Sequence, residues 1–297
     1  SDRLVRPMIK QDGRWQEVDW QVALDFVAKG LQGVRARHGA AQIGALATPH
    51  QTVEELYLLQ KYARGLGCEN IDFRTRQSDF AADSLQQGAP WLGMPVADIA
   101  QLDRALVIGS TLRKDHPLLA QRLRQAARRG AKVMSLHALR DSWLMPVAQH
   151  MVVPPSQWVA SLAAIAAAIA QSKGVTAPMA VQADDRAKAI AQGLLSGQHK
   201  AVLLGHAALH HPHAEELWGI AGWIAAQVDA TVGCLGEGAN AVGAQWVDAM
   251  PGTSGMNAAQ MVAQPPRAML LLNVEPGLDV ADAGTARMAL EVATIGG

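Results

Sequence analysis

A single glycine turn is the first place in this sequence where chemistry could occur. The apolar run Ala105–Ile108 leads into Gly109, and Pro117 opens a helix a few residues later. A strand, a glycine turn and a helix start together can make a phosphate-binding site, because helix N-terminal amides attract anions. Dinucleotide and P-loop motifs need further glycines at fixed spacings, which this turn lacks. Since Asp115 and Pro117 are also ordinary helix-start signals, the turn is either a cofactor site or a plain strand-to-helix connection.

A histidine-rich tract lies between a later strand and its helix. It contains His206, His210, His211 and His213, and such tracts can bind metal ions. The spacing is not the helical HExxH of a zinc site, and Pro212 interrupts the tract. The sequence therefore predicts no metal ligands here.

A cationic segment follows the glycine turn. Its members are Arg113, Lys114, Arg122, Arg124, Arg128 and Arg129. Such a set could bind a phosphate group or an acidic partner, although it is more often the solvated face of an amphipathic helix. In a chain whose formal net charge is zero, a solvated face or a subunit interface is the favoured interpretation.

A glycine-rich stretch over Thr231–Met256 offers a second place for close backbone approach to a ligand. It fits a loop folded over another domain equally well. Cys234 within it could be a reactive thiol, but no charged neighbour in the sequence clearly favours its thiolate. Since no nucleophile, base and acid are arranged together, the sequence predicts no catalytic residues.

Composition limits the kind of protein this can be. The 297 residues suffice for two domains, and 49% hydrophobic with 18% charged residues allows a large buried core. The neutral charge balance argues against nucleic acid or an anionic membrane surface as the main partner. Cys68 and Cys234 are isolated, which fits a reducing cytosol and cannot hold an iron–sulfur cluster alone. The most apolar run, Trp158–Ala170, is too short to span a bilayer, and the charged start is not a signal peptide.

The order of the expected elements predicts an α/β fold. Strand-like and helical runs follow the order β-α-β-β-α from residue 104 to about 171, which is typical of a doubly wound, mainly parallel sheet. The alternation fades over 74–100, breaks again after the helix, and then restarts. Thr52 and Glu55 form a capping box before a helix that ends at residue 65 or 67. The chain starts at Ser1 and stops in a strand-like run, so we expect a fragment excised from a longer protein.

Four stretches resemble the catalytic subunits of molybdopterin-dependent oxidoreductases. They are Arg6–Leu24, Arg104–Val133, Gly236–Ala244 and Leu270–Pro276. Within that family the chain is most similar to the large iron–sulfur subunit of bacterial NADH-quinone oxidoreductase (respiratory complex I). The most specific part of this resemblance lies in two segments, "GSTLRKDHPLLAQRLRQAARRGAKV" and "RQSDFAADSLQQGAPWLGMPVADI". The resemblance covers nearly the whole chain and implies two doubly wound, mainly parallel α/β lobes of the formate dehydrogenase/DMSO reductase type.

The resemblance also implies a domain order. Residues 1–19 would form an N-terminal hairpin segment, and residues 20–75 with 190–297 would form a discontinuous first lobe. Residues 76–189 would form a second lobe inserted into the first. The broken alternation falls at both expected junctions.

Two departures from the family pattern imply a lost cofactor site. Active members supply a Cys, selenocysteine or Ser to molybdenum after the first lobe, whereas here that region has no Cys and Ser78 is a weak candidate. Active members also carry an acidic residue and an Arg that recognise guanine, where this chain has His137 in "LHALRDS". The resemblance to the complex I protein therefore implies a structural domain without molybdopterin, catalytic residues or metal ligands.

The same resemblance implies where the domain works. Its partners would be other peripheral-arm subunits of complex I and the cluster-binding domain of the same subunit. It would lie on the cytoplasmic side, peripheral to the inner membrane, with no membrane insertion and no nucleic acid. The iron–sulfur clusters would lie in an N-terminal region that this chain lacks. The fragment would not be catalytic alone, although the parent complex transfers electrons from NADH to quinone.

Two alternatives stay open: a module that still binds a nucleotide or pterin, and an active molybdenum oxidoreductase with Ser78 as ligand. The residues of the vestigial site would be Gly109, Ser110, Thr111, Gly238 and Asn240. A binding module should leave the backbone N–H groups of the turn open. A remnant should fill the space with side chains such as Arg113 or His137.

Overall fold

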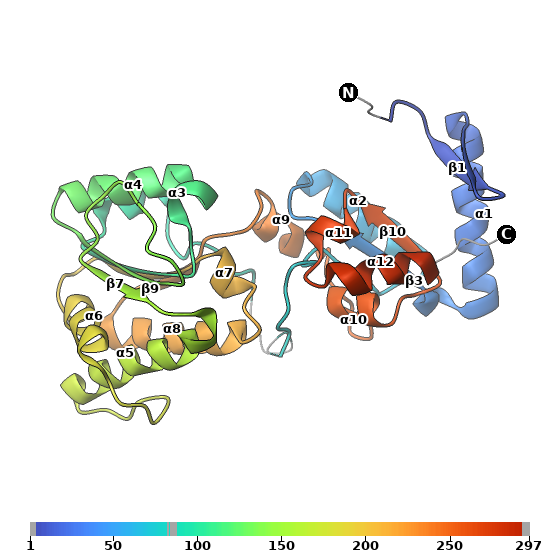
Figure 1. Cartoon of the computed structure of the whole chain (residues 1–297). Helices are drawn as coiled ribbons and strands as arrows, with labels where there is room; N and C mark the ends of the chain where they lie inside the picture. Colours follow the sequence, from blue (N-terminus) through green and yellow to red (C-terminus); the bar gives the residue numbers. More distant parts are fainter. Residues whose placement is uncertain (1–3, 82, 84–87, 293–297) are drawn as a thin grey trace. The chain divides into compact units, whose positions relative to one another are not determined.

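The computed structural model describes residues 4–81, 83 and 88–292 and divides into two compact units (Figure 1). One unit is Gln77–Val242, and the other combines the residues up to Arg76 with those from Gly243 onward. The predicted second junction at 189/190 is therefore wrong, since residues 190–242 belong to the inserted unit. The reason is strand pairing, because Lys200–Leu204 adds in parallel to Arg104–Ile108 in one sheet.

The inserted unit is built on a sheet of five parallel strands in the order β7-β6-β5-β8-β9. Its strands are β5 (Arg104–Ile108), β6 (Lys132–His137), β7 (Gln149–Val152), β8 (Lys200–Leu204) and β9 (Thr231–Cys234). Successive strands run outward from β5 in both directions, which is the doubly wound arrangement. This unit confirms the predicted fold class of parallel α/β sheets.

Helices cover both faces of this sheet (Figure 1). One face is packed by α5 (Trp158–Lys173), α6 (Asp185–Leu195) and α8 (Ala214–Val228). The other is packed by the 3-10 helix η2 (Val96–Gln101) and by α4 (Pro117–Arg128). Successive residues of β5 alternate between the two cores, as strand geometry requires. Short elements at the strand ends are α3 (Leu112–Asp115), η3 (Pro155–Gln157) and α7 (His206–Leu209).

The other unit contains a smaller parallel sheet in the order β10-β3-β4. Its strands are β3 (Ile43–Ala47), β4 (Ile71–Asp72) and β10 (Ala268–Leu272). Helices α1 (Trp20–His38) and α2 (Val53–Gly65) contribute to one core against β3, and α10 (Ala258–Ala263) contributes to another. The unit also has η1 (Ala40–Gln42), α11 (Pro276–Asp279) and α12 (Ala283–Val292). The N-terminal hairpin pairs β1 (Met8–Gln11) with β2 (Arg14–Glu17), and the chain changes unit within α9 (Ala241–Trp246).

Local sequence signals place most elements correctly. The capping box is present, because Thr52 Oγ1 accepts from the Glu55 N–H and the Glu55 carboxylate accepts from the Thr52 N–H. The expected strand at the end of the chain is wrong for Glu291 and Val292, which end α12. The rest of that prediction, residues 293–297, lies outside the described residues. Among the described residues, no helix combines the length and apolar character needed to cross a bilayer.

Candidate functional site

The turn after β5 uses its backbone groups within the protein. Gly109 has a φ of +61°, in the left-handed region that favours glycine. Its N–H donates to the Leu136 carbonyl at 2.9 Å, and its own carbonyl accepts from the Ala207 N–H at 2.9 Å. Gly109 is thus hydrogen-bonded both to the end of β6 and to the start of α7. Neither backbone group of Gly109 is left open to receive a ligand.

Close packing also explains why this position is glycine. A Cβ added to Gly109 would lie 2.5 Å from the Ala208 nitrogen and 2.8 Å from the Trp158 ring. Both distances are below any real Cβ contact. The glycine therefore allows α7 and the first residue of α5 to approach the turn. In a dinucleotide fingerprint the missing side chain admits a pyrophosphate instead.

The next two residues of the turn are also enclosed. The Thr111 N–H donates to Asp115 Oδ2 at 3.0 Å, so a side-chain carboxylate occupies the place that an anion would take. Ser110 is 2% exposed, and its Oγ is buried with no hydrogen-bond partner in the described structure. A Cβ on Gly205 would lie 2.3 Å from Ser110 Cβ, which shows how closely the residue after β8 approaches this turn. The buried Ser110 hydroxyl is the one feature here that favours a ligand.

Aromatic rings fill the space beside the turn. Trp158 is 1% exposed, and its ring lies 5.7 Å from that of His211 and 5.9 Å from that of His137, measured between centroids. The Trp158 Nε1–H donates to the Val153 carbonyl. His211 Nδ1 accepts from the His213 N–H, so its Nε2–H is left to donate to the Pro155 carbonyl. The expectation that His137 helps to fill this space agrees with the ring contact, whereas Arg113 is exposed.

The glycine-rich loop meets the same edge of the sheet. His116 Nε2 and His206 Nε2 each lie 2.9 Å from the Gly236 carbonyl oxygen, and each N–H donates to it. His210 Nε2 lies 3.1 Å from Glu237 Oε2. Burial, together with the nearby His206, lowers the pKa of His116 despite its bond to the Gly236 carbonyl. Histidine side chains therefore hold this loop, with His116 in its neutral form at neutral pH.

The predicted site residues all lie in the inserted unit. Their positions do not require a ligand that they share. Gly238 accepts a weak 3.4 Å hydrogen bond from the Ala241 N–H, and Asn240 is half-buried on the same loop. Gly109, Ser110 and Thr111 follow β5, and the loop follows β9, both at the carboxyl edge of the sheet. Their role in binding a cofactor stays a prediction.

The described residues contain no group of three or more His, Cys, Asp and Glu side chains that could hold a metal ion. The histidine tract instead bonds backbone carbonyls and Glu237. The Ser78 hydroxyl donates to the His210 carbonyl at 2.8 Å. Burial raises the pKa of Cys234 to about 11 and also raises that of Cys68, so both thiols stay protonated at neutral pH.

The other unit contains a buried ion pair that its sequence did not predict. Asp72 is fully buried at the end of β4 and accepts from Arg74 Nε at 2.9 Å and Nη2 at 3.0 Å. Its Oδ2 also accepts from the Ala258 N–H at 3.0 Å, in the first turn of α10. The only signal in the sequence was an acid and a base two residues apart after a short strand, which is common. This pair joins β4 to a helix 186 residues away.

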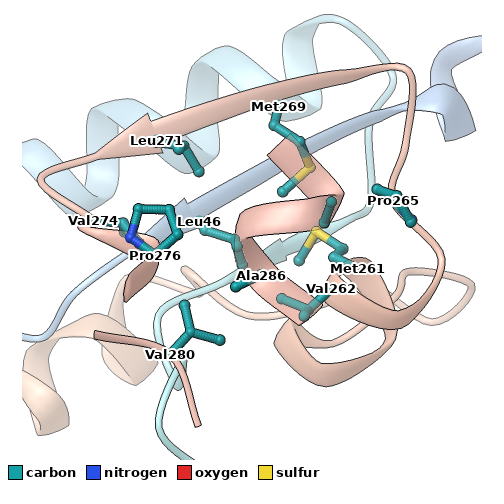
Figure 2. A pocket seen from close by; sticks show the side chains of 11 residues that line it. Leu46, Met261, Val262, Pro265, Met269, Leu271, Val274, Pro276, Val280 and Ala286 are labelled. Atoms are coloured by element: carbon teal, nitrogen blue, oxygen red, sulfur yellow. The ribbon is translucent and has the colours of Figure 1, made fainter. Parts of the chain in front are cut away.

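An apolar cavity in that same unit offers no chemistry (Figure 2). It lies among β3, β10 and the helices α10 to α12, and Met261 and Met269 project into it. The labelled side chains are those of Leu, Met, Val, Pro and Ala, and the free space holds little more than one water. Without polar groups to orient a ligand, it is an imperfection of core packing.

The residues of the turn do not fit a pterin dinucleotide phosphate. Two of the three turn N–H groups donate within the protein, and Asp115 brings a negative charge to the turn. The space that a missing Cβ opens at Gly109 is filled by α7 and Trp158. Only the Ser110 hydroxyl of this turn is without a partner among the described residues. No chemical step through such a group follows from this geometry.

Comparison with known proteins gives one family. The model of the molybdopterin oxidoreductase family matches residues 3–294. The probable oxidoreductase YjgC of Bacillus subtilis is 33% identical over 139 residues, which cover 45% of this chain and 14% of that protein. The F420-dependent formate dehydrogenase subunit alpha of Methanocaldococcus jannaschii is 32% identical over 144 residues, 47% of this chain and 21% of that protein. The matched part of the chain thus covers about a fifth or less of these relatives' length.

Solved structures also share the fold. A chain of the formyltransferase/hydrolase complex FhcABCD from Methylorubrum extorquens, solved with methylofuran, matches with a TM-score of 0.58. The alignment covers 91% of this chain and 77% of that chain at 18% sequence identity. At that identity the likeness concerns the fold alone.

Proposed function

This chain belongs to the molybdopterin oxidoreductase family, and from that premise we propose that it is a structural domain that keeps the family fold without a bound pterin. It is part of the large iron–sulfur subunit of NADH-quinone oxidoreductase, in a complex that transfers electrons from NADH to quinone. Its role there is to bury surface against the cluster-bearing domain and neighbouring peripheral-arm subunits. It works on the cytoplasmic side of the inner membrane, held there through the complex.

One observation carries the cofactor-free part of this proposal. The glycine of the β5 turn is needed for protein packing, because an added Cβ would meet the Ala208 nitrogen and the Trp158 ring. Asp115 also bonds the Thr111 N–H at the place where an anion would bind. A turn that is filled by protein and faced by a carboxylate supports a scaffold rather than a phosphate cradle.

The placement in complex I rests on the sequence resemblance over Arg104–Val133 and over the segment from Arg76 to Ile99. The curated relatives above are named an oxidoreductase and a formate dehydrogenase. What they act on belongs to those proteins, each of which is at least about twice as long as this chain.

The deciding experiment is elemental analysis with cofactor extraction. The full-length protein, tagged and purified from its own host, is analysed for molybdenum and tungsten, and acid extracts are examined for pterin fluorescence. We expect neither metal nor pterin above background, and we expect NADH:quinone reductase activity to copurify. Stoichiometric metal and pterin would overturn the cofactor-free proposal. Formate oxidation in place of NADH oxidation would overturn the placement in complex I.

A second candidate function is a nucleotide- or molybdopterin-binding module of an active molybdenum oxidoreductase. The buried, unpartnered Ser110 hydroxyl favours it, as does the formate dehydrogenase activity named for one relative. Ser110→Ala with Thr111→Ala separates the two functions in the purified complex. Unchanged activity with normal assembly supports the scaffold. Lost activity with normal assembly supports the binding module.

A further inference from the structure

One exposed surface carries a strong positive charge that the fold does not explain. The segment Leu112–Lys132, which runs from α3 through α4 to the first residue of β6, holds seven Lys and Arg residues and one acid, Asp115. The whole chain, by contrast, has 26 of each sign. We call this surface the arginine face. Its cations are Arg113, Lys114, Arg122, Arg124, Arg128, Arg129 and Lys132.

No ion pair within the described residues neutralises the arginine face. Of the side chains of its seven cations, only that of Arg129 has a hydrogen bond in this part of the structure, which it donates to the Ala100 carbonyl at 3.4 Å. Helix α6 differs, since its Arg186 and Lys188 lie 3.3 Å from Asp184 and 3.7 Å from Asp185, respectively. The charge of the arginine face is therefore available to another molecule.

Helix stability does not account for this charge pattern. Arg128 and Arg129 lie at the C-terminal end of α4, where cations are favourable to the helix dipole. Arg113 and Lys114 lie in the last turn of the short helix α3, but they also precede the N-terminus of α4, where cations are unfavourable to the dipole of that helix. Arg124 and Arg128 are four residues apart, which places like charges side by side. Part of the pattern thus acts against the helix that carries it.

The arginines of α4 border a neutral stripe. Residues three and four apart share one side of a helix, and this stripe consists of Leu118, Gln121 and Gln125. Arg124 and Arg128 flank it on one side, and Arg122 and Arg129, two turns apart, flank it on the other. Leu118, at the start of the stripe, is 79% exposed. An exposed apolar side chain with an arginine border has the composition of a protein-binding surface.

We propose that the arginine face docks on a carboxylate-rich surface of another polypeptide. Planar guanidinium groups pair with carboxylates in a bidentate manner, and arginine is enriched at protein interfaces. Nucleic acid is less suited, because the chain as a whole carries no net charge and Leu112–Lys132 contains no Phe, Trp or Tyr on which the bases of a single strand could stack. A membrane surface is less suited because helices that lie in the lipid interface need a broad apolar face. On this surface Leu118 is the only exposed large hydrophobic residue.

The proposal adds the chemistry of a partner and does not depend on whether a cofactor is bound. The test places a photoreactive benzophenone side chain in place of the exposed Gln121, in the full-length protein within its own host. Cross-linked peptides are identified by mass spectrometry after purification of the assembly. The reversal Arg124→Glu with Arg128→Glu is compared with Lys29→Glu and Arg35→Glu, an equal charge change at exposed positions of α1.

We expect a cross-link to a peptide in which Asp and Glu exceed Lys and Arg. We expect the reversal on α4 to lower its yield about tenfold, or about 1.4 kcal/mol, and the control on α1 to keep it within about twofold. Cross-links to nucleic acid or lipid, to a neutral or basic peptide, or to no molecule would overturn the proposal. So would equal losses in both variants. If circular dichroism shows that the reversal disturbs folding, Arg124→Gln with Arg128→Gln serves in its place.

Discussion

Replacing Gly109 by alanine tests whether protein fills the turn after β5. The change has two costs. A non-glycine residue at a φ of +61° costs about 1–2 kcal/mol in backbone strain. The added Cβ also meets the Ala208 nitrogen at 2.5 Å and the Trp158 ring at 2.8 Å, and overpacking of this kind costs about 1–3 kcal/mol. We therefore expect Gly109→Ala to lower the free energy of unfolding by about 2–5 kcal/mol.

Gly174→Ala is the matched control. Gly174 ends α5 in the same unit with a φ of +68°, and its added Cβ meets no atom within 4 Å. This variant should show the backbone strain alone, about 1–2 kcal/mol. The difference between the two variants isolates the packing of α7 and Trp158 against the turn.

The assay is urea unfolding monitored by tryptophan fluorescence, with both variants compared on the transition of the inserted unit. A larger loss for Gly109→Ala, at an unchanged dependence on urea, supports the filled turn. Equal losses for the two variants would refute the reasoning, because the turn would then have room for a side chain. Such room would favour the cofactor-binding alternative.

Three further predictions concern other parts of the chain. Thr52→Ala should lower the free energy of unfolding by about 1 kcal/mol in urea denaturation, because it removes the cap of α2, and Thr52→Ser should restore it. Asp72→Asn should cost about 3 kcal/mol in the same assay, because it breaks the buried pair with Arg74, and a loss below about 1 kcal/mol would contradict that role. Cys234 should resist alkylation at pH 8 until urea is added. Because its pKa is raised from 9.0 to about 11 in the folded state, the unfolded chain loses its proton first as the pH rises. Raising the pH from 8 to 11 should therefore destabilise the wild type by about 2 kcal/mol more than Cys234→Ala.

Local sequence was enough to predict most of the elements. Thr52 and Glu55 mark the start of α2 because a capping box forms between residues three apart. The alternation of strands and helices predicts parallel α/β sheets, since parallel strands need a crossover connection, which is usually a helix. These signals act over a few residues and need no knowledge of the rest of the chain.

Only the tertiary structure decided which unit each element joins and what fills the turn. Residues 190–242 belong to the inserted unit because β8 pairs with β5, across 96 residues of sequence. A glycine at position 109 could make room for a phosphate group or for a packed protein side chain. Which of the two lies there depends on Trp158 from α5 and Ala208 from α7. Strand partners and packing neighbours are set by surfaces that form far apart in the chain. The sequence by itself therefore determined the elements and the family likeness, whereas the contacts made on folding decided the chemistry open to the turn.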